Sequence, residues 1–273
     1  MPTITTTDNT QLYVKDWGTG RPVILMHGWP LSSDSWDDQA MALANAGYRA
    51  IAYDRRGFGR SSQPWSGYDY DTLADDLAAV IEQTGARDAT LVGFSMGGGE
   101  VARYMSRHGG KSVVKAALVS SVVPYMLKTG DNPDGTEQAA FDQMAQAMQE
   151  DRAKFFAGFF KDFFGVGVIS HPVSEQVLQW ACNVSMQAGL NATLACAKSF
   201  ATTDFRGDLP AFKVPTLVIH GIEDKTVPID AAGRAAAKGI AQSTLIEYEG
   251  APHGLFATEK KRFTSDLLEF LAR

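Results

Sequence analysis

The sequence has few cysteines and no long hydrophobic run. Cys182 and Cys196 are its two cysteines, and they form no Cys-x-x-Cys pattern, so we expect reduced thiols rather than a disulfide framework. The most apolar stretch, residues 113–123, is interrupted by Lys115 and two serines and is far shorter than the roughly 20 residues of a membrane span. These absences argue against a disulfide-stapled scaffold and against a membrane-spanning protein.

The sequence also lacks an excess of basic residues. It has 25 lysines and arginines against 31 acidic residues, a net charge of -6, and no basic cluster interleaved with aromatic residues. Nucleic acid is therefore not an expected partner. Residues 1–8 are polar and lack the basic and apolar segments of a secretory signal. We expect a cytoplasmic protein that does not bind membranes, and the sequence is compatible with a homo-oligomer.

What the sequence does have is enough apolar residues for a large core, since 45% of its 273 residues are hydrophobic. Short apolar runs such as residues 22–26 and 89–94 predict strands buried on both faces. Amphipathic windows such as residues 71–84 predict the helices between them. This alternation indicates an α/β fold with a mostly parallel sheet.

The alternation of strands and helices stops in the middle of the chain. Residues 124–204 contain helical windows rich in Ala, Met, Gln and Phe and no convincing strand pattern. The strand pattern resumes at residues 214–219. We therefore predict a core formed by residues 1–123 and 205–273, with residues 124–204 inserted into it as a helical lid.

A Gly-Phe-Ser-Met-Gly sequence at residues 93–97 lies between a predicted buried strand and a predicted helix. A serine in this context sits on a tight, strained turn, and the flanking glycines remove side chains that would collide with neighbouring backbone. We predict that Ser95 is a nucleophile. The alternative is a glycine-rich loop that binds phosphate, but the Gly-Lys-Ser/Thr of a P-loop does not follow.

A nucleophilic serine needs a base, which is itself oriented by a third group. His253 and Asp224 each lie in a loop that directly follows a predicted strand. Such loops meet at the carboxyl edge of a parallel sheet, where open α/β folds build their sites. The order Ser95, Asp224, His253 is also that of α/β-hydrolases. We predict these three residues as the catalytic set.

The remaining histidines are assigned structural roles. We expect His220 to bond to backbone at the end of a strand, His27 to brace its loop, His108 to close a helix and His171 to be exposed. Glu223 is the alternative to Asp224, but on an extended loop its side chain points elsewhere. No pair of histidines has metal-ligand spacing, so a metal site is not expected.

Acyl transfer places negative charge on the substrate carbonyl oxygen, which two backbone N–H groups can stabilise. One predicted donor is Met96, directly after the nucleophile. The other is Trp29, in the His-Gly-Trp-Pro loop at residues 27–30, where Pro30 has no N–H to offer.

The substrate pocket is expected to be apolar and cramped, which favours short acyl chains. Aromatic residues at helical spacing in the lid usually form core, so only one or two of them are expected to contact substrate. The residues predicted to line the pocket are Trp29, Phe94, Met126, Phe159 and Phe163.

Five separated motifs resemble the cofactor-free bacterial haloperoxidase (non-haem chloroperoxidase) and arylesterase group of α/β-hydrolases. They are residues 27–30, 54–62, 93–99, 214–221 and 251–254, and the match covers almost the whole chain. The resemblance implies an eight-stranded sheet with a four-helix lid and a triad of Ser95, Asp224 and His253. It also implies that no haem, flavin or metal takes part. One departure is Ile222, where a small or acidic residue is common.

The resemblance further implies hydrolysis of small carboxylic esters through an acyl-enzyme. Hydrogen peroxide can replace water in this reaction, and the peracid released then oxidises halide. The same fold and triad also serve lactamases, amidases and carbon–carbon bond hydrolases, which stay open as alternatives. Haloalkane dehalogenation needs a carboxylate where Ser95 stands. A ligand-sensing module without catalysis is disfavoured by the complete set of three catalytic side chains.

Overall fold

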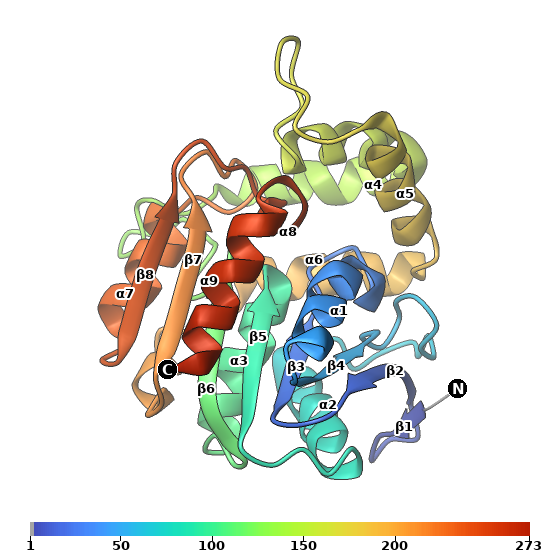
Figure 1. Cartoon of the computed structure of the whole chain (residues 1–273). Coiled ribbons are helices and arrows are strands. Elements are labelled where there is room, and N and C mark those ends of the chain that lie inside the picture. The colour runs from blue at the N-terminus through green and yellow to red at the C-terminus, as the bar shows by residue number, and fades with distance from the viewer. Residues whose placement is uncertain (1–2) are drawn as a thin grey trace.

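An eight-stranded sheet forms the centre of the protein (Figure 1). The computed structural model describes residues 3–273, and Met1 and Pro2, which begin the polar N-terminal stretch, lie outside the described residues. The strands are β1 (Thr3–Thr5), β2 (Gln11–Gly18), β3 (Pro22–Met26), β4 (Arg49–Tyr53), β5 (Ala89–Phe94), β6 (Val113–Val119), β7 (Thr216–Gly221) and β8 (Ser243–Tyr248).

The sheet is mostly parallel, with the strand order β1-β2-β4-β3-β5-β6-β7-β8. The strand β2 pairs antiparallel with both β1 and β4, and the pairs from β4-β3 to β7-β8 are all parallel. All side chains of β3, β5 and β7 are buried, as expected for parallel strands covered on both faces. The apolar runs predicted as buried strands at residues 22–26 and 89–94 coincide with β3 and β5.

Helices cover both faces of the sheet. Figure 1 shows α1 and α9 in front of the strands, while α2 and α3 pack against each other behind them. The core helices are α1 (Asp37–Asn45), α2 (Tyr70–Gln83), α3 (Met96–Arg107), α7 (Ala235–Gly239), α8 (Leu255–Thr258) and α9 (Lys260–Ala272), with short turns η1 (Ser33–Trp36), η2 (Leu209–Ala211) and η3 (Asp230–Arg234).

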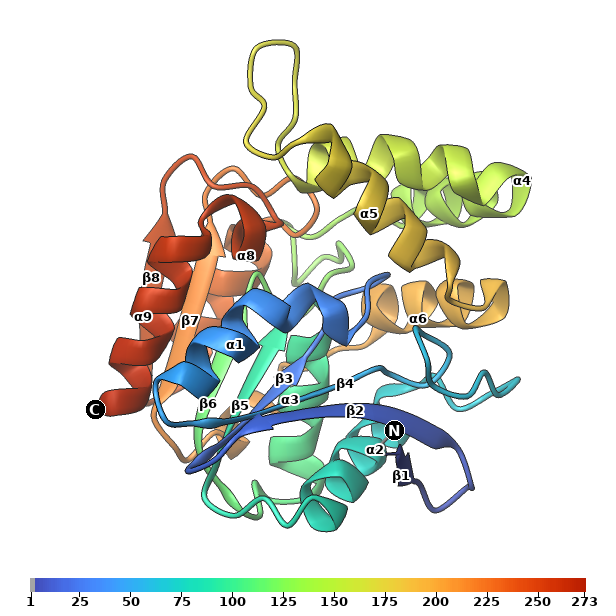
Figure 2. The ribbon, with the colours of Figure 1, turned by 45° about the vertical axis from the view of Figure 1, so that its right-hand side comes forward.

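Three further helices lie between β6 and β7 in the chain: α4 (Gln138–Phe163), α5 (Glu175–Met186) and α6 (Leu190–Thr202). Figure 2 shows them across the end of the sheet to which the strand arrows point. The helix α4 is broken at Asp151, where φ is -156° and ψ is 88°, so the inserted segment contains four helical pieces. This arrangement leaves the carboxyl ends of the strands covered by the inserted helices.

Among residues 3–273, no helix combines the length and the apolar composition that crossing a membrane requires.

The central strand β3 offers a test of how much core packing contributes to the free energy of unfolding. Met26, at the end of β3, is fully buried, whereas Met41 on α1 is 58% exposed. Met26→Ala removes well-packed atoms and leaves a cavity, so we expect the free energy of unfolding to fall by about 2–5 kcal/mol. Met41→Ala, the matched control, should change it by less than about 0.5 kcal/mol. Urea unfolding measures both, and equal losses would contradict this description of the core.

Candidate active site

Ser95 occupies the turn between β5 and α3. Its backbone has φ 53° and ψ -119°, a left-handed conformation that non-glycine residues rarely adopt. A Cβ on Gly93 would lie 2.4 Å from the carbonyl oxygen of Gly97, and a Cβ on Gly97 would lie 2.5 Å from that of Met26. The two glycines therefore allow the close backbone approach that this turn requires.

Three loops bring Ser95, His253 and Asp224 together at the carboxyl edge of the sheet, after β5, β8 and β7. The Ser95 hydroxyl donates to His253 Nε2 over 2.9 Å, and His253 Nδ1 donates to Asp224 Oδ2 over 2.6 Å. The exposed fraction is 5% for Ser95, 0% for His253 and 6% for Asp224. The three predicted residues thus form one continuous, buried chain of hydrogen bonds.

The carboxylate of Asp224 is held from both sides. Its Oδ1 accepts the backbone N–H groups of Thr226 at 2.9 Å and Val227 at 2.8 Å. Burial raises its pKa, but the charge of His253 and hydrogen bonds from His220 and His253 outweigh this effect and hold the pKa well below its usual range. Asp224 is therefore an anion beside the His253 ring at neutral pH.

His220 is a second histidine on the same carboxylate. Its Nε2 lies 2.9 Å from the carbonyl oxygen of Val227, the backbone bond expected from the sequence, and 3.3 Å from Asp224 Oδ2. Because both neighbours are acceptors, Nε2 carries the hydrogen. Its Nδ1 has no partner among residues 3–273. The sequence analysis missed this contact, for which the four-residue spacing from His220 to Asp224 is the available signal.

Two backbone N–H groups next to the Ser95 turn lack hydrogen-bond partners among residues 3–273. Met96 is the first residue of α3, and Trp29 lies in the loop after β3. Within residues 3–273 neither N–H donates a hydrogen bond. These are the two donors predicted from the sequence for a developing oxyanion.

The loop that carries Trp29 is braced by a buried polar network. His27 Nδ1 donates to the carbonyl oxygen of Gly28 over 2.9 Å, and its Nε2 accepts the backbone N–H of Arg55 over 3.0 Å. Burial and the charge of Arg55 lower the pKa of His27 to about 3, so the ring stays neutral. The Arg55 guanidinium in turn donates over 2.6 Å both to the His27 carbonyl oxygen and to Glu100 on α3.

A small cavity of about 60 Å³ opens beside Ser95. Three of the predicted pocket residues line it, namely Trp29, Met126 and Phe159. The rings of Phe94 and Phe163 instead pack against His253, with centroids 5.1 and 4.8 Å from its ring. The sequence analysis missed the other lining residues, which are Val122, Phe141, Met144, Phe200, Thr226 and Val227.

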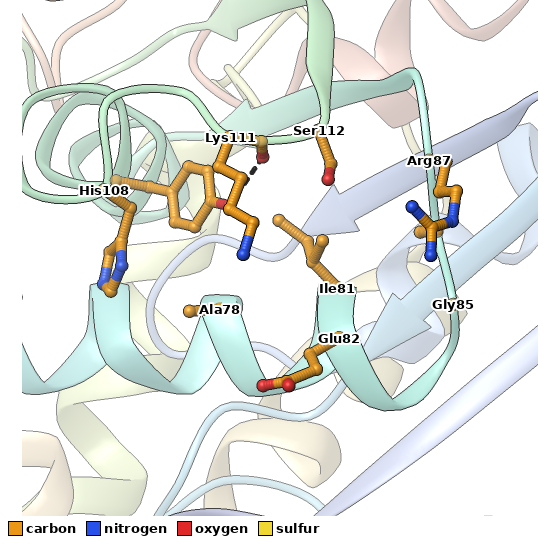
Figure 3. Close-up of a pocket in the computed structure, with 10 residues that line it drawn as sticks. Ala78, Ile81, Glu82, Gly85, Arg87, His108, Lys111 and Ser112 are labelled. Atoms are coloured by element: carbon orange, nitrogen blue, oxygen red, sulfur yellow. Dashed lines mark hydrogen bonds between the residues drawn. The ribbon is translucent and has the colours of Figure 1, made fainter.

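A larger hollow of about 400 Å³ lies between α2 and α3, near the amino ends of β5 and β6 (Figure 3). Its polar side chains serve local structure: His108 Nε2 lies 2.8 Å from Asp75, and the Tyr104 hydroxyl donates to the carbonyl oxygen of Lys111 over 2.8 Å. It contains no nucleophile bonded to a base, so the cavity at Ser95 is the candidate active site. In the described chain, no group of three or more His, Cys, Asp or Glu is arranged to hold a metal ion.

The sequence pattern of the alpha/beta hydrolase fold family matches residues 21–260. The chain belongs to the α/β-hydrolase family. A non-heme chloroperoxidase of Kitasatospora aureofaciens is 43% identical to this hydrolase, over 99% of each chain. A bifunctional esterase/perhydrolase of Acinetobacter calcoaceticus is 42% identical, over 98% of each. A bromoperoxidase from Bacillus anthracis is 44% identical in sequence. Its crystal structure superposes with a TM-score of 0.96, covering 100% of this chain and 99% of that one.

These similarities confirm the resemblance to the haloperoxidase and esterase group that the five motifs indicated. They also confirm the predicted fold class, since the sheet of this hydrolase has eight mostly parallel strands between helices.

The pair of Arg55 and Glu100 gives a test of the network behind the Trp29 loop. Arg55→Met leaves a buried carboxylate without its cation, so we expect the free energy of unfolding to fall by about 3–5 kcal/mol. The double substitution Arg55→Met, Glu100→Met should lower the free energy of unfolding by less, because it leaves no unpaired buried charge. Arg107→Met, which removes an exposed pair with Asp75, serves as control and should cost less than about 1 kcal/mol. Urea unfolding would refute this account if Arg55→Met matched the control.

Proposed function

We propose that this α/β-hydrolase cleaves small carboxylic esters through an acyl-enzyme on Ser95, and that hydrogen peroxide can replace water to release a peracid. The observation that carries the proposal is the buried chain from Ser95 through His253 to Asp224, with distances of 2.9 and 2.6 Å. The relatives named as non-heme chloroperoxidase and as esterase/perhydrolase support the same reaction.

In the first half-reaction, Ser95 Oγ attacks the carbonyl carbon of the ester and its proton moves to His253 Nε2. Asp224 holds the imidazole in the required tautomer and stabilises its cationic form. The negative charge on the carbonyl oxygen is stabilised by the N–H groups of Trp29 and Met96. His253 then returns the proton to the departing alcohol, which leaves an acyl group on Ser95.

In the second half-reaction, His253 takes a proton from water or hydrogen peroxide as its oxygen attacks the acyl carbon. Collapse of the intermediate returns the proton to Ser95 Oγ and releases a carboxylic acid or a peracid. A peracid that reaches solution transfers one oxygen to a halide ion, which yields the carboxylate and hypohalous acid. The protein needs no contact with the halide for this last step.

The size and lining of the cavity support short acyl groups. Its volume of about 60 Å³ is less than half the roughly 150 Å³ of an engineered apolar cavity that binds benzene. Trp29, Met126 and Phe159 provide apolar walls. We propose that the inserted segment, residues 124–204, acts as the lid that closes this cavity. Since Cys182 and Cys196 are free thiols, we also propose the cytoplasm, a reducing compartment, as its location.

Ser95→Ala tests the nucleophile. We expect kcat for p-nitrophenyl acetate to fall by about four orders of magnitude or more, because the remaining groups supply binding and charge stabilisation only. Covalent labelling by a fluorophosphonate should disappear. The exposed Ser66→Ala is the matched control and should keep both properties. Near-normal hydrolysis by purified Ser95→Ala would show that another residue is the nucleophile.

His220→Leu tests whether His220 positions Asp224. Loss of the Nε2 donor removes a hydrogen bond that partly offsets the negative charge of Asp224 beside His253. It also gives the Asp224 side chain more freedom to move. We expect kcat to fall about tenfold with KM within twofold, and the acidic limb of the kcat profile to move to higher pH. His220→Gln retains an N–H donor and should restore much of both. An unchanged profile in His220→Leu, or an equal defect in both variants, would assign His220 a packing role only.

A further inference from the structure

Another hollow, larger than the Ser95 cavity, lies beside that cavity. It is a groove of about 360 Å³ between α4 and α6. Phe141 and Met144 line both the groove and the cavity. The two spaces are therefore separated by the same two side chains.

Both side chains of this wall are only half-buried, whereas Trp29, Val122 and Met126 in the same cavity lining are buried. The Phe141 ring lies 6.4 Å from that of Phe200, which faces the cavity. Met144 is unbranched and flexible, the type of side chain that adapts to a changing neighbour. Phe141 and Met144 are therefore the side chains that would have to move to join the cavity to the groove.

The groove has an apolar floor and a polar rim. Ala197 and Ala201 on α6 are buried in the floor, and Ala145 on α4 is half-buried. The exposed rim carries one charge of each sign, Asp142 and Lys198. Such a groove favours an uncharged, elongated apolar group, because the floor removes apolar surface from water and the rim attracts neither ionic sign.

We propose that this groove is an outer subsite for the alcohol portion of an ester, reached between Phe141 and Met144. The proposal rests on the proposed esterase function and names its substrate class: esters of a short acid with an elongated apolar alcohol. The acyl group remains on Ser95 through both half-reactions and has about 60 Å³ in which to stay. The alcohol must leave before water or peroxide enters, and the groove of about 360 Å³ opens to solvent.

The test compares the hydrolysis of ethyl acetate with that of octyl acetate, and titration of the acetic acid released measures each rate. Both esters form the same acetyl-enzyme, so differences in kcat/KM report the alcohol side. Each methylene that becomes buried raises kcat/KM by up to about fourfold. We expect kcat/KM for octyl acetate to exceed that for ethyl acetate by at least about tenfold. By contrast, kcat/KM for p-nitrophenyl octanoate should be no higher than that for p-nitrophenyl acetate.

Ala145→Phe fills the groove and should lower the ratio of kcat/KM for octyl to ethyl acetate about tenfold. Thr202→Trp, on the opposite rim, provides a second variant should the first fold poorly. The neighbouring Gln146→Phe is exposed and does not line the groove, so it should leave the ratio unchanged.

An active enzyme whose ratio is the same in Ala145→Phe, Thr202→Trp and wild type would overturn the subsite. A chain-length gain on the acyl side alone would do the same. If these variants change only the sedimentation of the protein, the groove is an interface between copies and the proposal is wrong. Absence of ethyl acetate hydrolysis in the wild type would instead contradict the proposed esterase function itself.

Discussion

The left-handed backbone of Ser95 is the constraint on which the rest of the site depends. With φ at 53°, the turn after β5 points the hydroxyl toward His253 and starts α3 at Met96. This geometry is possible only because Gly93 and Gly97 leave no side chain between tightly approaching backbones. The strain is therefore maintained by the sheet on one side and by α3 on the other, and the fully buried strands resist the relaxation that would relieve it.

Around this turn the protein arranges charge so that few groups need to move during a reaction. Asp224 accepts two backbone N–H groups and lies beside two histidines, so the anion opposite His253 is stabilised before any substrate binds. On the other side, His27 is kept neutral and fixed by Arg55, which also bonds to Glu100 on the helix that follows Ser95. Both halves of the site are preorganised by buried hydrogen bonds, which gain strength from the low dielectric of the interior.

The helices inserted between β6 and β7 provide part of the cavity wall that the sheet alone does not provide. Trp29 from the core meets Phe159 and Phe200 from the inserted helices in edge-to-face contacts. The cavity that remains is small, and the wall formed by Phe141 and Met144 separates it from the outer groove. The hydrogen-bonded triad thus lies at the strand ends, while the walls of the cavity come from both the core and the inserted helices.

The sequence by itself determined the parallel sheet, the turn at Ser95 and the loops of Asp224 and His253, because buried strands and tight turns leave short-range patterns. The two N–H groups predicted as oxyanion donors follow from the same patterns, since each lies shortly after a strand end. Only the tertiary structure decided that Phe94 and Phe163 support His253 rather than line the cavity, and that His220 reaches Asp224. The physical reason is that helix periodicity shows which residues are apolar together, but the crossing of helices over the sheet decides which of them face the cavity.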